Sequence, residues 1–505
     1  MAKKITAAEA AALIQDESTV AVSGFVGSGH PEALSAAVES RFLKEGAPRD
    51  LVLLYSAGQG DGKGRGLGHF AHPGLVRRVV GGHWNWAPEL GRMAVSGEIE
   101  AYNLPQGVIT QLFRAAAAGQ PGVITRTGLG TFVDPRLEGG RLNDRSPEPL
   151  VELLELDGEE YLRYRPLAPN VALLRASAAD GKGNLSDDRE AVRLELLSMA
   201  QAVKSRGGAV IAQVAELRER IPPRSVTVPG MLVDYVVVAP EELHWQTYAT
   251  QYSPVFAGYE RADLAETGAL APDWRRIVAR RALMEIKDGA IINLGIGAPE
   301  AVAKAAREAH RARKLTLTVE AGGIGGVPAG GLDFGAVYNA EAMMEHTSQF
   351  DLYDGGCLDV SCLGFAQADA SGCVNVSKFN GRVAGCGGFI DISQNAKKLL
   401  FCGSFTTGGL SASSEGGRLR IEREGRIRKF VREIEQVTFS GPFAAAQGRE
   451  VLYITERALF RLGAEGLVLE EIAPGADLER DILGQMDFRP AISPKLREMP
   501  PSVFA

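Results

Sequence analysis

The stretch from Leu315 to Gly331 reads Leu-Thr-Leu-Thr-Val-Glu320-Ala-Gly-Gly-Ile-Gly-Gly-Val-Pro-Ala-Gly-Gly. Its β-branched and Leu residues predict a buried strand that ends at Glu320, and strand ends are where open α/β sheets bind ligands. Glycines lack a Cβ, so the six that follow let backbone N–H groups approach a ligand closely. A carboxylate facing such donors suits attack on a carbonyl whose oxyanion must be held. Glu320 is therefore a candidate nucleophile, and a solvated turn carboxylate is the alternative.

The chain repeats the motif G-x-G-x-P-E-A after an apolar run, first at residues 27–33 and again at residues 295–301. A second match follows at nearly the same spacing, because Leu51-Val-Leu-Leu-Tyr-Ser56-Ala-Gly corresponds to the segment that contains Glu320. The two halves therefore look like two copies of one α/β unit. Ser56 occupies the place of Glu320 in the first copy, so only the second copy carries a carboxylate there.

Each copy opens as a strand, a glycine turn and a helix. Pro31 and Pro299 suit the first helical position, where no N–H is needed, and helices are expected over 32–44 and 300–313. Strands that alternate with helices predict an α/β fold of two tandem, related domains with mainly parallel sheets covered by helices. A helix N-terminus behind a glycine turn can also bind an anion.

The length of 505 residues suits two domains. We place the first at residues 1–265, with an insertion at about 60–165, and the second, which carries Glu320, at 270–505. The polar stretch 258–274 is the expected linker. Glycine makes up 60 of the 505 residues, well above the usual share of about 7%, which suits an enzyme with loop-lined sites.

Composition narrows the class of protein. The chain is 45% hydrophobic and 23% charged, with a net charge of −7, which argues against nucleic-acid binding. It has no long apolar run for a membrane span and no apolar segment near its start for secretion, so we expect a cytoplasmic protein. Its five cysteines are odd in number and all lie in the second half. They are expected to be buried thiols without a disulfide or a metal.

A dinucleotide-binding dehydrogenase is the alternative from another class. It requires G-x-G-x-x-G and an acidic residue about 20 positions further on, and Gly295, Gly297 and Glu320 partly fit. The third glycine position is Glu300, however, and the first copy has Ser56 at the acidic position. A ribose-binding acid also has no need of six glycines after it.

Several motifs, in order along essentially the whole chain, resemble family I coenzyme A transferases. They are Glu320 with its glycine run, Gly24-Phe25 with Gly29-x-Pro31, Ala101-Tyr-Asn-Leu-Pro-Gln106-Gly107, Thr127-Gly-Leu-Gly-Thr-Phe-Val-Asp134-Pro135 and Gly385-Cys-Gly-Gly388-Phe-Ile-Asp-Ile. The chain is most similar to the fused, single-chain members of the propionate and acetate CoA-transferase type. It departs from the two-subunit and ketoacid branches, which have Ser-Glu-Asn-Gly where this chain has Val319-Glu320-Ala321-Gly322. Ser23 and Cys357 replace expected glycines.

The resemblance implies ping-pong transfer of CoA from a short-chain acyl-CoA to a free carboxylate, such as acetate or propionate, with acetoacetate and butyrate as further candidates. Glu320 would be the nucleophile and would carry CoA as a transient thioester, so CoA is a substrate and no cofactor or metal is required. Gln106 resembles the active-site glutamine of the family, and the backbone N–H of Gly388 is the implied oxyanion donor. In the alternative readings, both are turn residues.

Further residues are candidates for binding the substrate and CoA. They are Gly27, Gly29, Gly295, Gly297, Gly322, Gly323, Gly385, Gly387, Lys378 and Arg382. Lys397 and Lys398 are additional candidates for the CoA phosphates. The glycine-rich run 60–68 would help to cover the site and exclude water. The nearby histidines are interpreted as packing or hydrogen-bonding residues.

Partners and a competing reaction complete the expectations. We expect acyl-CoA and short-chain carboxylates as the partners, no nucleic acid and no membrane, and a homo-oligomer, either dimer or tetramer. An acyl-CoA hydrolase that uses the same Glu320 remains an alternative, because water could resolve the glutamyl thioester. A non-catalytic CoA-binding protein is a weaker one, since both Glu320 and Gln106 are present.

Overall fold

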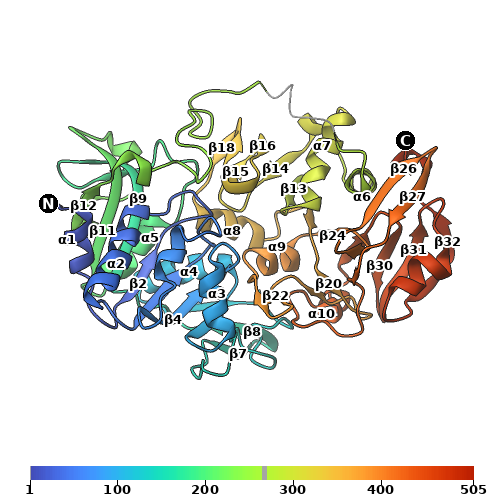
Figure 1. Cartoon of the computed structure of the whole chain (residues 1–505), viewed down its shortest axis with the longest axis horizontal. Helices are drawn as coiled ribbons and strands as arrows, with labels where there is room; N and C mark the ends of the chain where they lie inside the picture. The colour runs from blue at the N-terminus through green and yellow to red at the C-terminus, as the bar shows by residue number, and fades with distance from the viewer. Residues whose placement is uncertain (1, 264–269) are drawn as a thin grey trace. The chain divides into compact units, whose positions relative to one another are not determined.

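The computed structural model describes residues 2–263 and 270–505. Part of the expected linker, including the boundary placed at 265, lies outside these residues. The chain forms two compact units that do not follow its linear order (Figure 1). Unit 1 contains residues 1–262, 319–351 and 380–391, and unit 2 contains residues 263–318, 352–379 and 392–505. The segment that carries Glu320 therefore packs with the N-terminal part of the chain.

Unit 1 is built on a sheet of eight parallel strands to which one short antiparallel strand, β10, is added. In spatial order the parallel strands are β1 (Lys3–Lys4), β12 (Tyr235–Val238), β11 (Ala209–Arg218), β9 (Val171–Asp180), β2 (Thr19–Val22), β3 (Leu51–Tyr55), β4 (Val76–Gly81) and β5 (Glu100–Asn103). The chain builds outward from β2 through β3, β4 and β5, and later returns to the other side of β2 with β9, β11 and β12. The carboxyl ends of the strands around this reversal are the expected place for a ligand.

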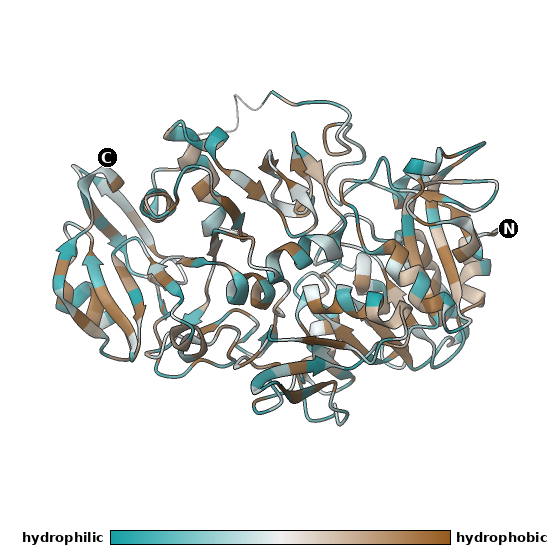
Figure 2. Ribbon diagram, turned by 180° about the vertical axis from the view of Figure 1, so that it is seen from behind, coloured by the Kyte–Doolittle hydropathy of each residue, from teal (hydrophilic) through white to brown (hydrophobic). Residues whose placement is uncertain are grey.

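Alternate residues of these strands face opposite sides of the sheet, as the β period of two requires. One core contains Val20 and Val22 of β2 and Leu51 and Leu53 of β3, packed under α1 (Ala7–Ala12) and α2 (Glu32–Glu45). Figure 1 shows α1 and α2 on one side of the strands, and α4 (Gln106–Ala117) and α5 (Leu196–Lys204) on the other. In Figure 2 the strands are largely apolar, whereas polar residues lie mainly on helices and loops.

Smaller elements complete unit 1. They are η1 (Gly66–Phe70), α3 (Pro88–Val95), β10 (Leu185–Ser186), η2 (Pro223–Ser225), η3 (Gly230–Leu232), η4 (Glu241–Leu243), the three-stranded antiparallel sheet β6 (Val123–Thr125), β8 (Glu159–Tyr164) and β7 (Val151–Leu156), and the pairs β15 (Gly323–Ile324) with β18 (Ala342–Met343) and β16 (Val327–Pro328) with β17 (Val337–Tyr338). Helices α8 (His346–Asp354) and α9 (Phe389–Asn395) begin in unit 1, as do η7 (Gly331–Asp333) and β23 (Arg382–Val383).

Unit 2 has a mixed sheet. In spatial order its strands are β14 (Thr316–Thr318), β13 (Ile291–Leu294), β19 (Val360–Leu363), β24 (Lys398–Cys402), β29 (Glu450–Ile454), β30 (Ala458–Gly463), β31 (Gly466–Ile472) and β32 (Ala491–Glu498). The first five are parallel, and β30 runs antiparallel to both of its neighbours. The apolar core joins these strands to α6 (Trp274–Leu283) and α7 (Ala301–Glu308).

The remaining elements of unit 2 are short. They are η5 (Ala298–Glu300), η6 (Ala312–Lys314), β20 (Gln367–Ala368), β21 (Val374–Asn375), β22 (Lys378–Phe379), β25 (Thr406–Thr407), β26 (Ser411–Glu415), β27 (Arg418–Arg423), β28 (Ile427–Arg428), α10 (Gly441–Ala446), the π-helical turn η8 (Leu478–Ile482), η9 (Leu483–Gln485) and η10 (Pro501–Val503). No helix of the described residues is both long and apolar enough to cross a membrane.

The predicted α/β fold with mainly parallel sheets and an internal repeat is confirmed. The order β3–β2–β9–β11 in unit 1 matches β14–β13–β19–β24 in unit 2. The expected helix at 32–44 is α2. Pro31 was expected at the first helical position, but it is the N-cap, one position earlier. The expected helix at 300–313 was too long, because α7 ends at Glu308 and a 3₁₀ turn follows.

Candidate active site

Glu320 lies in a tight turn that follows the predicted strand. The Val319 N–H donates to the Gly323 carbonyl at 2.8 Å, and the Gly322 N–H donates to the Val319 carbonyl at 2.9 Å. Gly322 has a φ of 109°, and a Cβ there would lie 2.1 Å from the Met344 carbonyl oxygen. Only glycine fits this position, so the glycine run serves first to form the turn that presents Glu320.

The Glu320 carboxylate lies against the backbone of Gly388. A Cβ built on Gly388 would come within 2.5 Å of Glu320 Oε2, so the missing side chain is what lets the carboxylate approach. The Gly388 N–H donates to no residue in the described part of the chain. An unused backbone donor beside a carboxylate is the arrangement that an oxyanion site requires.

Backbone hydrogen bonds hold the Gly388 segment at the carboxyl ends of β4 and β5. The Cys386 N–H donates to Asn103 Oδ1 at 2.9 Å, and the Gly387 N–H donates to the Gly82 carbonyl at 2.7 Å. The Gly387 carbonyl in turn accepts the N–H of Gln106 at 2.9 Å. Residues that are far apart in sequence are thereby fixed next to one another, and the predicted site residues Glu320, Gln106 and Gly388 meet in unit 1.

Gln106 is the first residue of α4 and is buried. Its side-chain Nε2 lies 2.9 Å from Nε2 of His346. A Cβ on Gly387 would be 3.6 Å from Gln106 Oε1, so the amide oxygen faces the segment that leads to Gly388. The amide therefore lies between His346 and the oxyanion donor.

Two residues that sequence analysis did not assign to the site complete a buried hydrogen-bond chain. His346 Nδ1 lies 2.7 Å from Glu195 Oε2, and the other oxygen of Glu195 accepts a hydrogen bond from the Ser56 hydroxyl. The sequence predicted His346 only as a packing or hydrogen-bonding residue, and it hydrogen-bonds here. Glu195 had no sequence signal, because it lies at an ordinary helix start. Ser56, the counterpart of Glu320, is thus part of the surroundings of the site.

Electrostatics support a reactive carboxylate at position 320. Burial raises the pKa of Glu320 from 4.5 to about 7, and a positive charge on His346, when that ring is protonated, acts in the opposite direction. Its carboxylate accepts no hydrogen bond from the described residues. Burial would also raise the pKa of Glu195, but the hydrogen bonds from His346 and Ser56, with the charge of His346 when it is protonated, outweigh burial and lower that pKa. A carboxylate without hydrogen bonds keeps its lone pairs available for attack.

The other glycines that were predicted to bind substrate or CoA differ in how much free space surrounds them. A Cβ on Gly27 would lie 2.3 Å from the Tyr248 backbone nitrogen, and one on Gly29 would lie 2.4 Å from a Leu194 methyl carbon, so this turn is packed inside unit 1. The N-terminus of α2 is also occupied, since Gln213 Oε1 accepts two of its N–H groups. In unit 2 nothing lies within 4 Å of a Cβ on Gly297. The turn of the second copy is therefore the more open of the two.

The candidate cations for the CoA phosphates differ in whether they already form an ion pair. Lys378 and Arg382 form no ion pair with any residue in 2–263 or 270–505. Lys397 is paired with Asp359 at 2.9 Å, and Lys398 is paired with Glu285 at 2.6 Å. The paired lysines already have partners, so Lys378 and Arg382 remain the better candidates for a phosphate. Lys378 belongs to unit 2 and Arg382 to unit 1.

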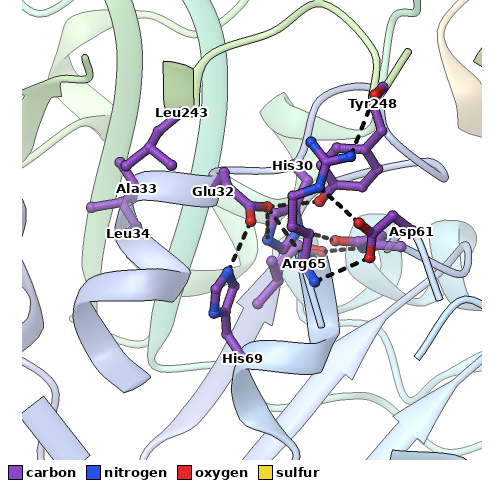
Figure 3. Close-up of polar contacts among 12 residues, drawn as sticks. His30, Glu32, Ala33, Leu34, Asp61, Arg65, His69, Leu243 and Tyr248 are labelled. Carbon is purple, nitrogen blue, oxygen red and sulfur yellow. Dashed lines mark hydrogen bonds and ion pairs between the residues drawn. The ribbon is translucent and has the colours of Figure 1, made fainter. Parts of the chain in front are cut away.

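The glycine-rich run 60–68 is tied down by a polar cluster in unit 1 (Figure 3). Glu32 accepts hydrogen bonds from the Gly66 N–H at 3.1 Å, from His69 at 2.8 Å and from the Tyr248 hydroxyl at 2.7 Å. Burial alone would raise the pKa of Glu32, but these partners lower it to about 2. Figure 3 shows His69 and Tyr248 pointing toward Glu32 and Arg65 beside Asp61. The predicted cover is thus an anchored loop.

The cysteines are all free, as expected, and four of them are buried, but Cys357 is exposed. No group of three or more His, Cys, Asp or Glu within the described ranges could hold a metal ion.

Comparison with known proteins decides the family. The coenzyme A transferase family model matches residues 4–239. The caffeate CoA-transferase of Acetobacterium woodii is 46% identical over 512 residues, covering 100% of this chain and 98% of the relative. The acetate CoA-transferase YdiF of Escherichia coli K12 is 45% identical, covering 99% and 94%. The chain belongs to the coenzyme A transferase family.

Solved structures agree with this assignment. The apoenzyme of the acyl-CoA transferase YdiF from Escherichia coli O157:H7 matches 100% of this chain and 96% of its own, with a TM-score of 0.95 and 43% identity. A thioester complex of the same enzyme with CoA matches equally well. The acetate CoA-transferase subunit alpha of Escherichia coli K12 is 32% identical and covers 47% of this chain. The protein is therefore an enzyme that transfers CoA, and the expected fold and activity are confirmed.

Proposed function

We propose that this CoA transferase moves CoA from a short-chain acyl-CoA to a free carboxylate through a thioester on Glu320. The observation that carries the proposal is the position of the Glu320 carboxylate against the unused N–H of Gly388. The carboxylate has no hydrogen bonds to break before it attacks, and the donor lies where negative charge would develop.

The first half-reaction needs four bond changes. A Glu320 oxygen attacks the thioester carbonyl, the carbon–sulfur bond breaks, and an acyl-glutamyl anhydride and CoA thiolate result. The thiolate then attacks the side-chain carbonyl of Glu320, and the bond to the acyl oxygen breaks. The acid leaves as a carboxylate and the glutamyl-CoA thioester remains. An incoming carboxylate reverses both steps, so no net proton, ATP or metal is consumed and CoA is a substrate.

Gln106 and Gly388 would hold the oxygens that change charge in these steps. The Gly388 N–H donates to the developing oxyanion, and the Gln106 amide contacts the acid or carboxylate. Gly322 and Gly323 shape the turn that presents Glu320, and Gly385 and Gly387 shape the donor segment. Lys378, Arg382 and the open glycine turn at 295–297 are proposed for CoA.

Mass spectrometry tests the covalent step. Incubation with propionyl-CoA without an acceptor should add one CoA to the peptide that contains Glu320, and later addition of acetate should remove it and yield acetyl-CoA. Glu320→Gln should carry no CoA and should lose transfer. The matched control Glu345→Gln, which removes a carboxylate paired with Arg114 at 2.9 Å, should behave as the parent. CoA on another residue, or none during turnover, would refute the mechanism.

The same experiment separates transfer from hydrolysis. New acetyl-CoA identifies a transferase, and free CoA in its place identifies a hydrolase that uses water to resolve the thioester. Acetate is a proposed acceptor by analogy with the acetate CoA-transferase YdiF, and propionate is proposed from the resemblance of the motifs to the propionate CoA-transferase type. A homo-oligomer, dimer or tetramer, and a cytoplasmic location are part of this proposal.

A further inference from the structure

His346 lies between Glu195 and Gln106, and these two side chains determine which of its ring nitrogens carries a hydrogen. Glu195 is ionised and already accepts the Ser56 hydroxyl, so a hydrogen on His346 Nδ1 must donate to its other oxygen at 2.7 Å. The second ring nitrogen faces Gln106 Nε2 at 2.9 Å. An amide nitrogen can only donate, so His346 accepts at Nε2 in this arrangement and is neutral.

A second proton on His346 would reverse that hydrogen bond. Nε2 would become a donor and would need an acceptor, and the only acceptor on the Gln106 side chain is its amide oxygen. The amide must then turn over. Its NH₂ group would face the side of Gly387, where Oε1 now lies, and so would face the donor segment beside Glu320. One proton on His346 therefore decides whether Gln106 presents an acceptor or a donor to the site.

The charge balance of the reaction favours the protonated form when a free carboxylate is bound. Glu320 is negative in the free enzyme, but it becomes neutral as a thioester. An incoming carboxylate then restores one negative charge beside His346. That carboxylate requires donors, and the turned amide of Gln106 supplies one in addition to the Gly388 N–H. Once it gains its second proton, the imidazolium held by Glu195 would be the positive partner of the bound carboxylate.

We propose that His346, held by Glu195, is a positioning residue whose second proton turns the Gln106 amide so that its NH₂ binds the acceptor carboxylate. The proposal rests on the function proposed above. The groups that face His346 are Glu195, Gln106, the charge of Glu320, and the rings of Phe25 at 5.9 Å and Phe350 at 5.4 Å. Its own N–H donates to the Arg193 carbonyl at 2.8 Å.

The second half-reaction isolates this effect, because Glu320 cannot titrate while it is a thioester. Enzyme loaded with CoA is mixed with acetate in single-turnover experiments from about pH 5.5 to about pH 9, a range that brackets the titration of histidine. Acetate stays ionised throughout. The rate in the parent should fall as the pH rises. A rate that is flat or rises over this range overturns the proposal.

Two variants sharpen the test. In His346→Asn, the amide can still donate to Glu195, as Nδ1 does, but it carries no titrating proton. The rate with acetate should fall about 10- to 100-fold, as for loss of a hydrogen bond to a charged group, and its pH dependence should vanish. In Glu195→Gln, the negative charge that favours the second proton is lost. The fall in rate should then begin at lower pH. A purely structural role would lower rates without moving the profile.

A control variant completes the test, and its outcomes separate failure of the proposed function from failure of the role of His346. His72→Asn removes another histidine of unit 1 that pairs with a carboxylate, Glu39 at 2.6 Å, and should keep the profile of the parent. Melting curves establish that the variants are folded, and the profile of the parent tests the proposal even if one variant is not. If the parent never loads CoA on Glu320, the proposed function fails. If it loads CoA but Glu195→Gln leaves the profile unmoved, only the role of His346 fails.

Discussion

At the scale of single residues, Gly388 has a steric role and a chemical role. Its missing side chain leaves room for the Glu320 carboxylate, and its N–H is the proposed oxyanion donor. The backbone at Gly388 has no left-handed φ, so alanine could adopt its conformation. Its Cβ, however, would stand 2.5 Å from Glu320 Oε2. The Phe350 ring would stand 2.9 Å away. The glycine is therefore required by these neighbouring side chains and not by the local backbone.

Gly388→Ala should accordingly fold but lose activity. We expect kcat to fall by about 100-fold or more, the loss that follows removal of one oxyanion donor, because Glu320 must move away from the Gly388 N–H. The matched control is Gly91→Ala in α3, where the new Cβ would have only an ordinary contact at 3.5 Å. CoA transfer by both purified variants is the measurement. Comparable activity in the two would show that the approach of Glu320 to Gly388 is not used.

Ionisation of Glu320 should lower the free energy of unfolding. Its pKa in the folded protein is raised from 4.5 to about 7 by burial. The protonated form is thus favoured by folding, and this stabilisation, about 3 kcal/mol, is complete below pH 4.5 and is lost as the pH rises through about 7.

Glu320→Gln mimics the protonated carboxyl group. Its melting temperature should match that of the parent near pH 5 and exceed it near pH 8.5, values on either side of the raised pKa. Thermal unfolding at both pH values is the measurement. A variant that gains nothing at the higher pH would mean that the carboxylate is well solvated in the folded enzyme.

At the scale of elements, the ends of β4 and β5 bind the 384–388 segment, while Glu32 holds the loop at 60–70 separately. His69 places its two ring nitrogens 2.8 Å from Glu32 and 2.6 Å from Glu39. Burial alone would lower the pKa of His69, but these carboxylates raise it. A single buried carboxylate at the start of α2 therefore fixes the loop.

Glu32→Gln should release this loop. Breaking a buried ion pair costs about 3 kcal/mol or more, so the melting temperature should fall and limited proteolysis should cut within residues 60–70. The control Glu45→Gln removes an exposed pair with Arg41 at 3.2 Å and should change stability by less than about 1 kcal/mol. Equal resistance of the two variants to protease would show that Glu32 does not hold the loop.

At the scale of the whole molecule, each compact unit is assembled from segments that are not consecutive in the chain. Residues 319–351 and 380–391 lie between the segments of unit 2 in sequence but pack within unit 1. A piece that ends at 262 would therefore lack Glu320 and Gly388. A relative of about half this length, the acetate CoA-transferase subunit alpha, is a separate chain.

The chain should therefore tolerate a cut between 262 and 270. Residues 1–262 and 270–505, when co-expressed, should copurify and transfer CoA, because segments of the second piece complete unit 1. Either piece alone should be inactive. The measurement is copurification through a tag on one piece, followed by the transfer assay. Pieces that fold but do not associate would contradict the division into units.

The sequence alone determined the features that local pattern encodes. Apolar runs, glycine turns and helical stretches repeat along the chain, so the two-copy α/β fold and the strand-end position of Glu320 followed from periodicity and backbone chemistry. Quoted motifs supplied the family and the pairing of Glu320 with Gln106 and Gly388. The end of α7 was misjudged because helix propensity is a weak prior, and the chain leaves the helix at His310, whose φ is 56°.

Only the tertiary structure decided which side chains surround the nucleophile. Glu195 and His346 are 151 positions apart, and His346 and Gln106 are 240 positions apart. No periodicity links such residues, because their contact arises only when strand ends and the 384–388 segment converge. Burial, which sets the raised pKa of Glu320, is likewise a property of the assembled fold. A sequence records the groups that can react, and packing decides which of them meet and in which protonation state.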